Sequence, residues 1–210
     1  MPGCLHSCVG CSGVMIPDAA DPIALFAKWL EEARQTGAPL AERVALATAS
    51  PEARPSVRMV LLKHFDQNGF VFYTSLESRK AADLAANPKA ALCFHWPETG
   101  KQVRVEGSVT LVTDEEADAY FATRPRESRL GAWASRQSAV LTSREELEQR
   151  FTDVEKEYEG RVVPRPPHWT GYRLAPDQIE FWMELPHRLH DRVLFCRVNH
   201  CGWNRTRLCP

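Results

Sequence analysis

The chain has 210 residues, of which 44% are hydrophobic and 25% are charged, values that are typical of a globular domain and exclude a disordered or fibrous chain. Lysine and arginine number 26 against 27 for aspartate and glutamate, which excludes the basic excess of a nonspecific nucleic-acid binder and makes any cationic site local. No apolar run approaches the roughly 18–20 residues that cross a bilayer, which excludes a membrane span.

Residues 1–20 are rich in glycine, cysteine, serine and proline and have no hydrophobic period, so we expect a mobile leader before a single domain at 21–210. The leader lacks the basic and apolar regions of a secretory signal, which predicts a cytoplasmic protein. Seven cysteines are an odd number in a chain long enough to bury its own core, and they indicate reduced thiols rather than a disulfide framework.

The domain is expected to begin with a helix, because Asp21 and Pro22 form a helix-start signal and apolar residues follow at helical spacing until Gly37. Turn formers then divide segments that are rich in β-branched and aromatic residues. Five or six strands are predicted before residue 113, in the segments 44–50, 56–65, 69–75, 89–96 and 102–112, with a short helix at 77–88.

Two helices and two late strands are predicted in the second half of the chain. Thr113 and Asp114 cap a helix that stops before Pro125, and a charged helix follows. The later segments are the charged helix at 143–158, a proline-rich connector at 163–169 and strands at 171–183 and 192–198. The late strands must pair with early ones, so the pattern predicts a mainly β, α+β fold: a small antiparallel barrel with flanking helices rather than βαβ units.

The short helix begins with Ser78-Arg79-Lys80, and two cations beside the positive end of a helix dipole are electrostatically misplaced. An anion would resolve the conflict, since backbone N–H groups, the hydroxyls of Ser78 and Thr74 and the two cations together form a phosphate cradle. The alternative is that Arg79 and Lys80 point into water.

Arg58 and Lys63 bracket the apolar strand segment 59–62. Alternation along a strand places their side chains on opposite faces unless a bulge or a strand end intervenes. We interpret the pair as contacts to two separate anionic groups. Charges that protect a solvated strand edge are the alternative.

Tyr120 and Arg124 lie four residues apart on one helix face, and Ser128 follows just beyond Pro125. All three side chains donate hydrogen bonds to phosphate or carboxylate, although the end of an amphipathic helix often carries such residues. The segment 180–192 combines aromatic rings with guanidinium groups and a histidine, which suit stacking on a flat heterocycle and proton transfer near neutral pH. A charged, exposed hairpin is the alternative for this segment.

Together these segments resemble a known family, the pyridoxine/pyridoxamine 5′-phosphate oxidases, from about Asp21 to Pro210. The motifs that carry the resemblance are RMVLLK (58–63), FYTSLESRK (72–80), QVRVEG (102–107), Arg124-Pro125, SRQS (135–138) and RLHDR (188–192). The resemblance implies a homodimer of an FMN-binding split antiparallel β-barrel, with FMN at the subunit interface. It also implies oxidation of pyridoxine or pyridoxamine 5′-phosphate to pyridoxal 5′-phosphate by O₂, with release of H₂O₂ and, from the amine, NH₃.

Matched position by position, the resemblance implies a cofactor site and a substrate site. The FMN contacts would be Arg58, Met59, Val60, Leu61, Leu62, Lys63, Tyr73, Thr74, Arg79, Lys80, Gln102, Gln137, Ser138, Trp182 and Arg192. The substrate contacts would be Lys63, Tyr120, Arg124, Ser128, Arg188 and His190. The last two residues would cover the other face of the pyridine ring and act in catalysis, by steadying developing charge or guiding the proton.

The chain departs from the family pattern at two places. Met183-Glu184-Leu185-Pro186 replaces the usual glycine-containing loop between EFW and RLHDR, and Cys209 stands where alanine is common.

Three other interpretations compete with the resemblance. The first is an iron–sulfur cluster on Cys4, Cys8 and Cys11, which have the spacing of radical-SAM ligands, although no matching barrel follows them. The second is a zinc site without a paired CxxC knuckle, on His187, His190, Cys196, His200 and Cys201. We predict no metal. The third is an FMN-binding barrel without activity, which would have no use for the substrate contacts.

Overall fold

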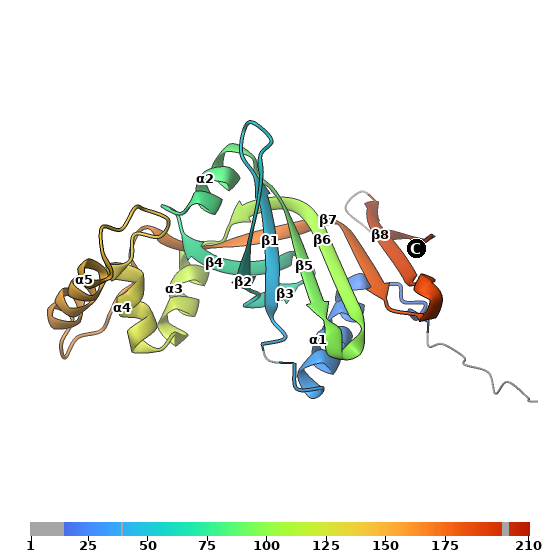
Figure 1. The fold of residues 1–210 in the computed structure, drawn as a ribbon, viewed down its shortest axis with the longest axis horizontal. Coiled ribbons are helices and arrows are strands. Elements are labelled where there is room, and N and C mark those ends of the chain that lie inside the picture. The colour runs from blue at the N-terminus through green and yellow to red at the C-terminus, as the bar shows by residue number, and fades with distance from the viewer. Residues whose placement is uncertain (1–14, 39, 199–201) are drawn as a thin grey trace, which may run out of the picture.

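The computed structural model describes residues 15–38, 40–198 and 202–210, and within these ranges nine antiparallel strands form one curled sheet with helices outside it (Figure 1). The α-helices are α1 (Pro22–Gln35), α2 (Arg79–Ala86), α3 (Asp114–Thr123), α4 (Arg126–Ala134) and α5 (Arg144–Glu157). The strands are β1 (Arg43–Ala49), β2 (Pro55–Leu61), β3 (His64–Asp66), β4 (Gly69–Ser75), β5 (Lys89–Trp96), β6 (Lys101–Leu111), β7 (Trp169–Met183), β8 (Asp191–Val198) and β9 (Gly202–Leu208). Short 3₁₀ turns lie at Pro97–Thr99 and Pro186–Arg188.

The sheet has the strand order β2-β1-β5-β6-β7-β4-β3, and β8 and β9 extend it from β7. Strand β7 is 15 residues long, and its first half pairs with β4 while its second half pairs with β8. The prediction that late strands pair with early ones is therefore confirmed. So is the predicted fold class, a mainly antiparallel split barrel with flanking helices.

The long strand β7 bends where its register with β6 shifts, between Glu106 and Gly107. A Cβ added to Gly107 would lie 2.0 Å from the carbonyl oxygen of Ala175, so only glycine lets the two backbones approach this closely. Pro176 pairs with Gly107 at this point and has no N–H to donate to the ladder. The irregularity is therefore built into both strands, and it lets one strand serve both halves of the sheet.

Helix α1 packs against the inside of the curled sheet. Its start is the predicted one, because the Asp21 carboxylate accepts a hydrogen bond of 2.9 Å from the Ile23 N–H. Its end is also as predicted, since Gly37 follows with φ +78°. Phe26 projects from the helix into the core and meets Phe70 and Phe94 edge-on, with 4.9 Å between ring centroids in each pair. This apolar packing fixes the barrel against which the functional cavity is built.

Helices α3, α4 and α5 gather at one end of the molecule, and β8 lies at the other end (Figure 1). Thr113 caps α3 and Ser143 caps α5, as the sequence predicts. Helix α4 was not predicted, because Pro125 stands at its N-cap and offers no side-chain acceptor. No helix among the residues that the structure describes is long and apolar enough to span a bilayer.

Two strand predictions need correction. A continuous strand over 56–65 is wrong: β2 ends at Leu61, and β3 begins only at His64. Strand β9 was not predicted, although it pairs with β8 along its whole length. Because β2 ends at Leu61, the side chains that follow do not keep the alternation of a continuous strand, and this affects the site.

Candidate functional site

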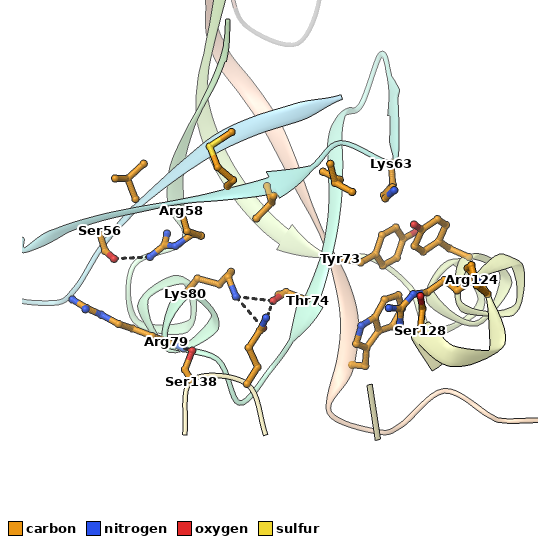
Figure 2. Close-up of a pocket in the computed structure, with 18 of the residues that line it drawn as sticks. Ser56, Arg58, Lys63, Tyr73, Thr74, Arg79, Lys80, Arg124, Ser128 and Ser138 are labelled. Carbon is orange, nitrogen blue, oxygen red and sulfur yellow. Dashed lines mark hydrogen bonds between the residues drawn. The ribbon is translucent and has the colours of Figure 1, made fainter. Parts of the chain in front are cut away.

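A cavity of about 790 Å³ opens between β2, β4, the start of α2 and the α3–α4 segment (Figure 2). Its volume is typical of small-molecule binding sites. The predicted site residues that line it are Arg58, Met59, Val60, Leu61, Lys63, Tyr73, Thr74, Arg79, Lys80, Tyr120, Arg124, Ser128, Gln137 and Ser138. Segments from residue 56 to residue 169 thus converge on one cavity.

Arg58 and Lys63 both face this cavity, although simple strand alternation would place them on opposite faces. The reason is the end of β2, after which the Lys63 N–H donates to the carbonyl oxygen of Val71 at 2.9 Å. Leu62, between them, has its side chain buried in the core rather than in the cavity. The exception to strand alternation, a strand that ends between the two residues, is therefore what the structure shows.

The start of α2 forms one cationic end of the cavity. Lys80 is buried, and its ammonium donates to the Thr74 hydroxyl at 2.9 Å and to the Gln137 side-chain oxygen at 3.0 Å (Figure 2). Burial, with a smaller contribution from the positive charge of Arg58, lowers the pKa of Lys80 to about 8. An anion beside it would favour the charged form of this lysine.

The predicted role of Ser78 in this cradle is wrong. Ser78 is fully buried, and its hydroxyl donates to the carbonyl oxygen of Ser75 at 2.7 Å instead of facing the cavity. The hydroxyl beside the helix start is that of Ser138, which accepts the Arg79 N–H at 3.3 Å.

The other end of the cavity is aromatic. The ring of Tyr73 stacks on Tyr120 at 4.1 Å and on Trp169 at 5.1 Å between centroids. The Arg124 guanidinium lies 4.8 Å from the centroid of Trp169 and 5.4 Å from that of Phe121. Burial lowers the pKa of Arg124 and raises the pKa of Tyr73 to about 12. These rings hold the guanidinium at the cavity wall.

The Nη1 atom of Arg124 is buried and has no hydrogen-bond partner among the residues that the structure describes. A buried cationic donor without a partner is costly, so this end of the cavity also suits an anion. Lys63 and Ser128 line the same region (Figure 2). Trp169, which completes this wall, was not predicted as a site residue.

The remaining predicted contacts lie elsewhere. Gln102, Trp182 and Arg192 are register partners on β6, β7 and β8, so they form a row across the sheet. Alternation along the strands places this row on the face away from the core. Arg188 and His190 follow the end of β7, and neither lines the cavity. A single chain therefore divides the predicted site into a cavity and a separate row.

The loop that carries Arg188 has an unusual backbone. His187 and Arg188 both have φ +60° and are exposed, whereas left-handed backbone is uncommon for residues other than glycine and asparagine. His190 is better held: its Nδ1 accepts the Leu185 N–H at 3.2 Å, and its ring lies 4.6 Å from that of Trp182.

The two alternative metal sites lie wholly or partly outside the described residues. No three histidine, cysteine, aspartate or glutamate side chains gather in a ligand arrangement within the described ranges. Cys4, Cys8 and Cys11 lie outside the described residues, as do His200 and Cys201.

The fold and the cavity define a split β-barrel protein with a cavity of small-molecule size that carries cationic side chains at both ends. Two family profiles match the chain: "Pyridoxamine 5′-phosphate oxidase" over residues 30–158 and "Pyridoxine 5′-phosphate oxidase C-terminal dimerisation region" over residues 169–210. The chain belongs to the pyridoxine/pyridoxamine 5′-phosphate oxidase family and is an oxidoreductase.

Curated relatives agree over nearly the whole chain. A pyridoxine/pyridoxamine 5′-phosphate oxidase of Rubrobacter xylanophilus is 55% identical over 190 residues, which cover 90% of this chain and 87% of the relative. That of Rhodospirillum rubrum is 56% identical over 195 residues, with 90% and 96% covered.

Solved structures share the fold. PhzG from Burkholderia lata 383, in complex with tetrahydrophenazine-1-carboxylic acid, superposes with a TM-score of 0.89 at 32% identity, over 96% of this chain and 100% of that one. A pyridoxamine 5′-phosphate oxidase-related, FMN-binding protein from Nostoc punctiforme has a TM-score of 0.73 at 21% identity, covering 92% and 99%, and supports the fold alone.

Proposed function

We propose that this protein is an FMN-dependent oxidase that converts pyridoxine 5′-phosphate and pyridoxamine 5′-phosphate to pyridoxal 5′-phosphate. The observation that carries the proposal is the pair of cationic ends in one cavity. Arg58, Arg79 and Lys80 lie at one end, and Lys63 and Arg124 lie toward the other (Figure 2). A flavin phosphate and a substrate phosphate would account for both ends.

The residues present fit FMN. A buried lysine whose pKa is lowered to about 8 beside a second cation needs an anion, and the phosphate of FMN would supply it. When bound, FMN would accept two electrons from the substrate and pass them to O₂. For pyridoxine 5′-phosphate the balance is one O₂ consumed and one H₂O₂ released. For pyridoxamine 5′-phosphate one water is also consumed and NH₃ is released.

The other end of the cavity would hold and orient the substrate. The unpartnered Nη1 of Arg124, with Lys63, Tyr120 and Ser128, would bind the substrate phosphate. Fixing the phosphate limits how the pyridine ring can lie, so much of the rate acceleration would come from positioning. The stacked rings of Tyr73, Tyr120 and Trp169 keep this wall rigid, since each ring is packed on another.

We further propose that a second copy of the chain completes the site, as a homodimer with FMN at the interface. Gln102, Trp182 and Arg192 form a row outside their own chain's cavity, and much of that row belongs to the segment that matches a dimerisation region. Val57 and Met59, which line the cavity, are 69% and 57% exposed, as expected for apolar side chains that a partner covers. The partner would also bring its copies of Arg188 and His190 over the substrate, to stabilise charge or guide a proton.

The test is to purify the protein, record the flavin spectrum, and assay peroxide and pyridoxal 5′-phosphate formed from pyridoxamine 5′-phosphate. We expect Arg79→Ala to weaken FMN retention, because it removes a cation from the phosphate end. Arg188→Ala is expected to retain FMN and lower turnover. Equal loss of FMN in both variants would contradict this division of roles, and bound flavin without product would favour an FMN-binding barrel that lacks activity.

A further inference from the structure

The guanidinium of Arg58 is held by a set of short polar contacts. Its Nη1 donates to the Thr48 hydroxyl at 2.8 Å and to the Leu46 carbonyl oxygen at 3.2 Å, and its Nη2 donates to the Ser56 hydroxyl at 2.7 Å. A guanidinium has five N–H donors. Within the described residues these bonds use three of them, so two stay available to a ligand in the cavity that Arg58 lines.

Behind Arg58 lies a buried carboxylate that the proposed mechanism does not use. Asp83 projects from α2 and is 6% exposed, and its Oδ2 accepts the Thr48 hydroxyl hydrogen at 2.6 Å. The same oxygen lies 3.8 Å from Nη2 of Arg58. Among the described residues, Arg58 is the one of the three cations at this end of the cavity that forms an ion pair, since Arg79 and Lys80 have none. A buried carboxylate is tolerated only where it is paired and hydrogen-bonded, as it is here.

Thr48 connects the two charges. Its hydroxyl donates to Asp83 and accepts from Arg58, so the order of the contacts is Asp83, then Thr48, then Arg58. Thr48 itself is buried on β1, and Asp83 lies on α2. The contacts therefore join a strand of the barrel to the helix whose start forms the phosphate end of the cavity, and they fix the direction of the guanidinium between them.

We propose that Thr48 and Asp83 are positioning residues that hold Arg58 in the orientation that binds the phosphate of the flavin cofactor. Neither residue lines the cavity, so each acts through Arg58. The inference rests on the proposed function, since it assumes that this end of the cavity binds FMN by its phosphate. It goes beyond that function because it assigns the orientation of the phosphate contact to two residues that do not touch the ligand.

If Asp83 acts only through its charge, its removal should affect phosphate binding differently than if it positions Arg58. A carboxylate near a phosphate site reduces its positive potential, so removal of Asp83 by itself would strengthen phosphate binding. A change at Thr48 separates the two effects, because Thr48→Val removes the hydroxyl and leaves every charge in place. Thr48→Ser is the matched control, because it keeps the hydroxyl and loses only a methyl group.

The experiment compares FMN with riboflavin, which lacks the phosphate. Dissociation constants for both are measured by flavin fluorescence quenching with the full-length apoprotein of the wild type, Thr48→Val, Thr48→Ser and Asp83→Asn. We expect Thr48→Val to weaken FMN binding about tenfold, comparable to one hydrogen bond to a charged group, and to change riboflavin binding less than about twofold. Thr48→Ser is expected to stay within about twofold of the wild type for both ligands. Asp83→Asn is expected to lose FMN affinity selectively, as Thr48→Val does.

The thermal midpoint of each apoprotein shows whether that variant folds. If Thr48→Val does not fold, FMN and riboflavin binding are compared between Thr48→Ser and Asp83→Asn. An equal loss of FMN and riboflavin affinity would overturn the proposal in favour of a merely structural role. Unchanged FMN binding in Thr48→Val, or tighter FMN binding in Asp83→Asn, would overturn it in favour of charge alone. A wild type that does not distinguish FMN from riboflavin would overturn the proposed phosphate site itself.

Discussion

The cavity and the loop at 184–190 are organised in opposite ways. In the cavity, three of the five lining cations are held by neighbours: Lys80 by two hydrogen bonds, Arg58 by three, and Arg124 by aromatic rings. In the loop, His187 and Arg188 are exposed and have left-handed backbone. The comparison indicates that a single chain already orders the cations Arg58 and Lys80, whereas it leaves Arg188 without neighbours that bury it. Substitutions in the cavity should therefore have the larger effects.

The largest effect is expected for Arg124→Ala. The variant removes a buried guanidinium whose Nη1 has no partner among the described residues, and with it the principal contact proposed for the substrate phosphate. Loss of such a charged contact, about 3 kcal/mol, should raise the KM for pyridoxamine 5′-phosphate about 100-fold. Steady-state kinetics measure the effect. Arg124→Lys is the control, because it keeps the charge but not the guanidinium that lies over Trp169. FMN lost together with substrate affinity would contradict separate phosphate ends.

An intermediate effect is expected from pH. Because burial and Arg58 lower the pKa of Lys80 to about 8, its ammonium loses its proton as the pH of the apoprotein rises through that value. A neutral amine attracts phosphate less, so FMN affinity should be highest near pH 7 and fall above pH 8, by up to about tenfold per pH unit. Titrations of FMN from pH 7 to 9.5 measure this, because a phosphate monoester, with a second pKa of about 6, keeps its charge over that range. Lys80→Arg stays charged and should flatten the curve; an unchanged curve in that variant would assign the titration to another group.

The smallest effect is expected in the loop. His187 has φ +60°, a conformation that asparagine adopts at lower cost than histidine. His187→Asn should therefore stabilise the protein by about 0.5 kcal/mol, or roughly 1–2 °C in Tm, without changing FMN affinity. Thermal unfolding followed by circular dichroism measures the shift. An unchanged or lower Tm would contradict the backbone strain assigned to His187.

Local signals predicted much of the site, because the cations of RMVLLK and of FYTSLESRK are set by short motifs next to a strand end and a helix start. The shared direction of Arg58 and Lys63 was not predictable, since it depends on where β2 ends and Lys63 bonds to Val71 of β4. Trp169 and Thr48 were missed because each reaches the site from a distant segment. Asp83 lies one helical turn after Arg79 in the sequence, which only weakly indicates a role near the site. Its partner on β1, Thr48, is visible only in the folded chain.

At Gly107 the backbones of β6 and β7 approach each other closely. No side chain of the site sets the distance between the two strands at this point. Strand β7 carries Trp169 of the cavity wall at one end and Trp182 of the outer row near the other. Its bend lies between them, beside a glycine whose Cβ would collide with a carbonyl oxygen. Any side chain at position 107 would push β6 and β7 apart and change the distance between Trp169 and Trp182. The placement of the cavity wall relative to the outer row thus depends on a backbone position that belongs to neither.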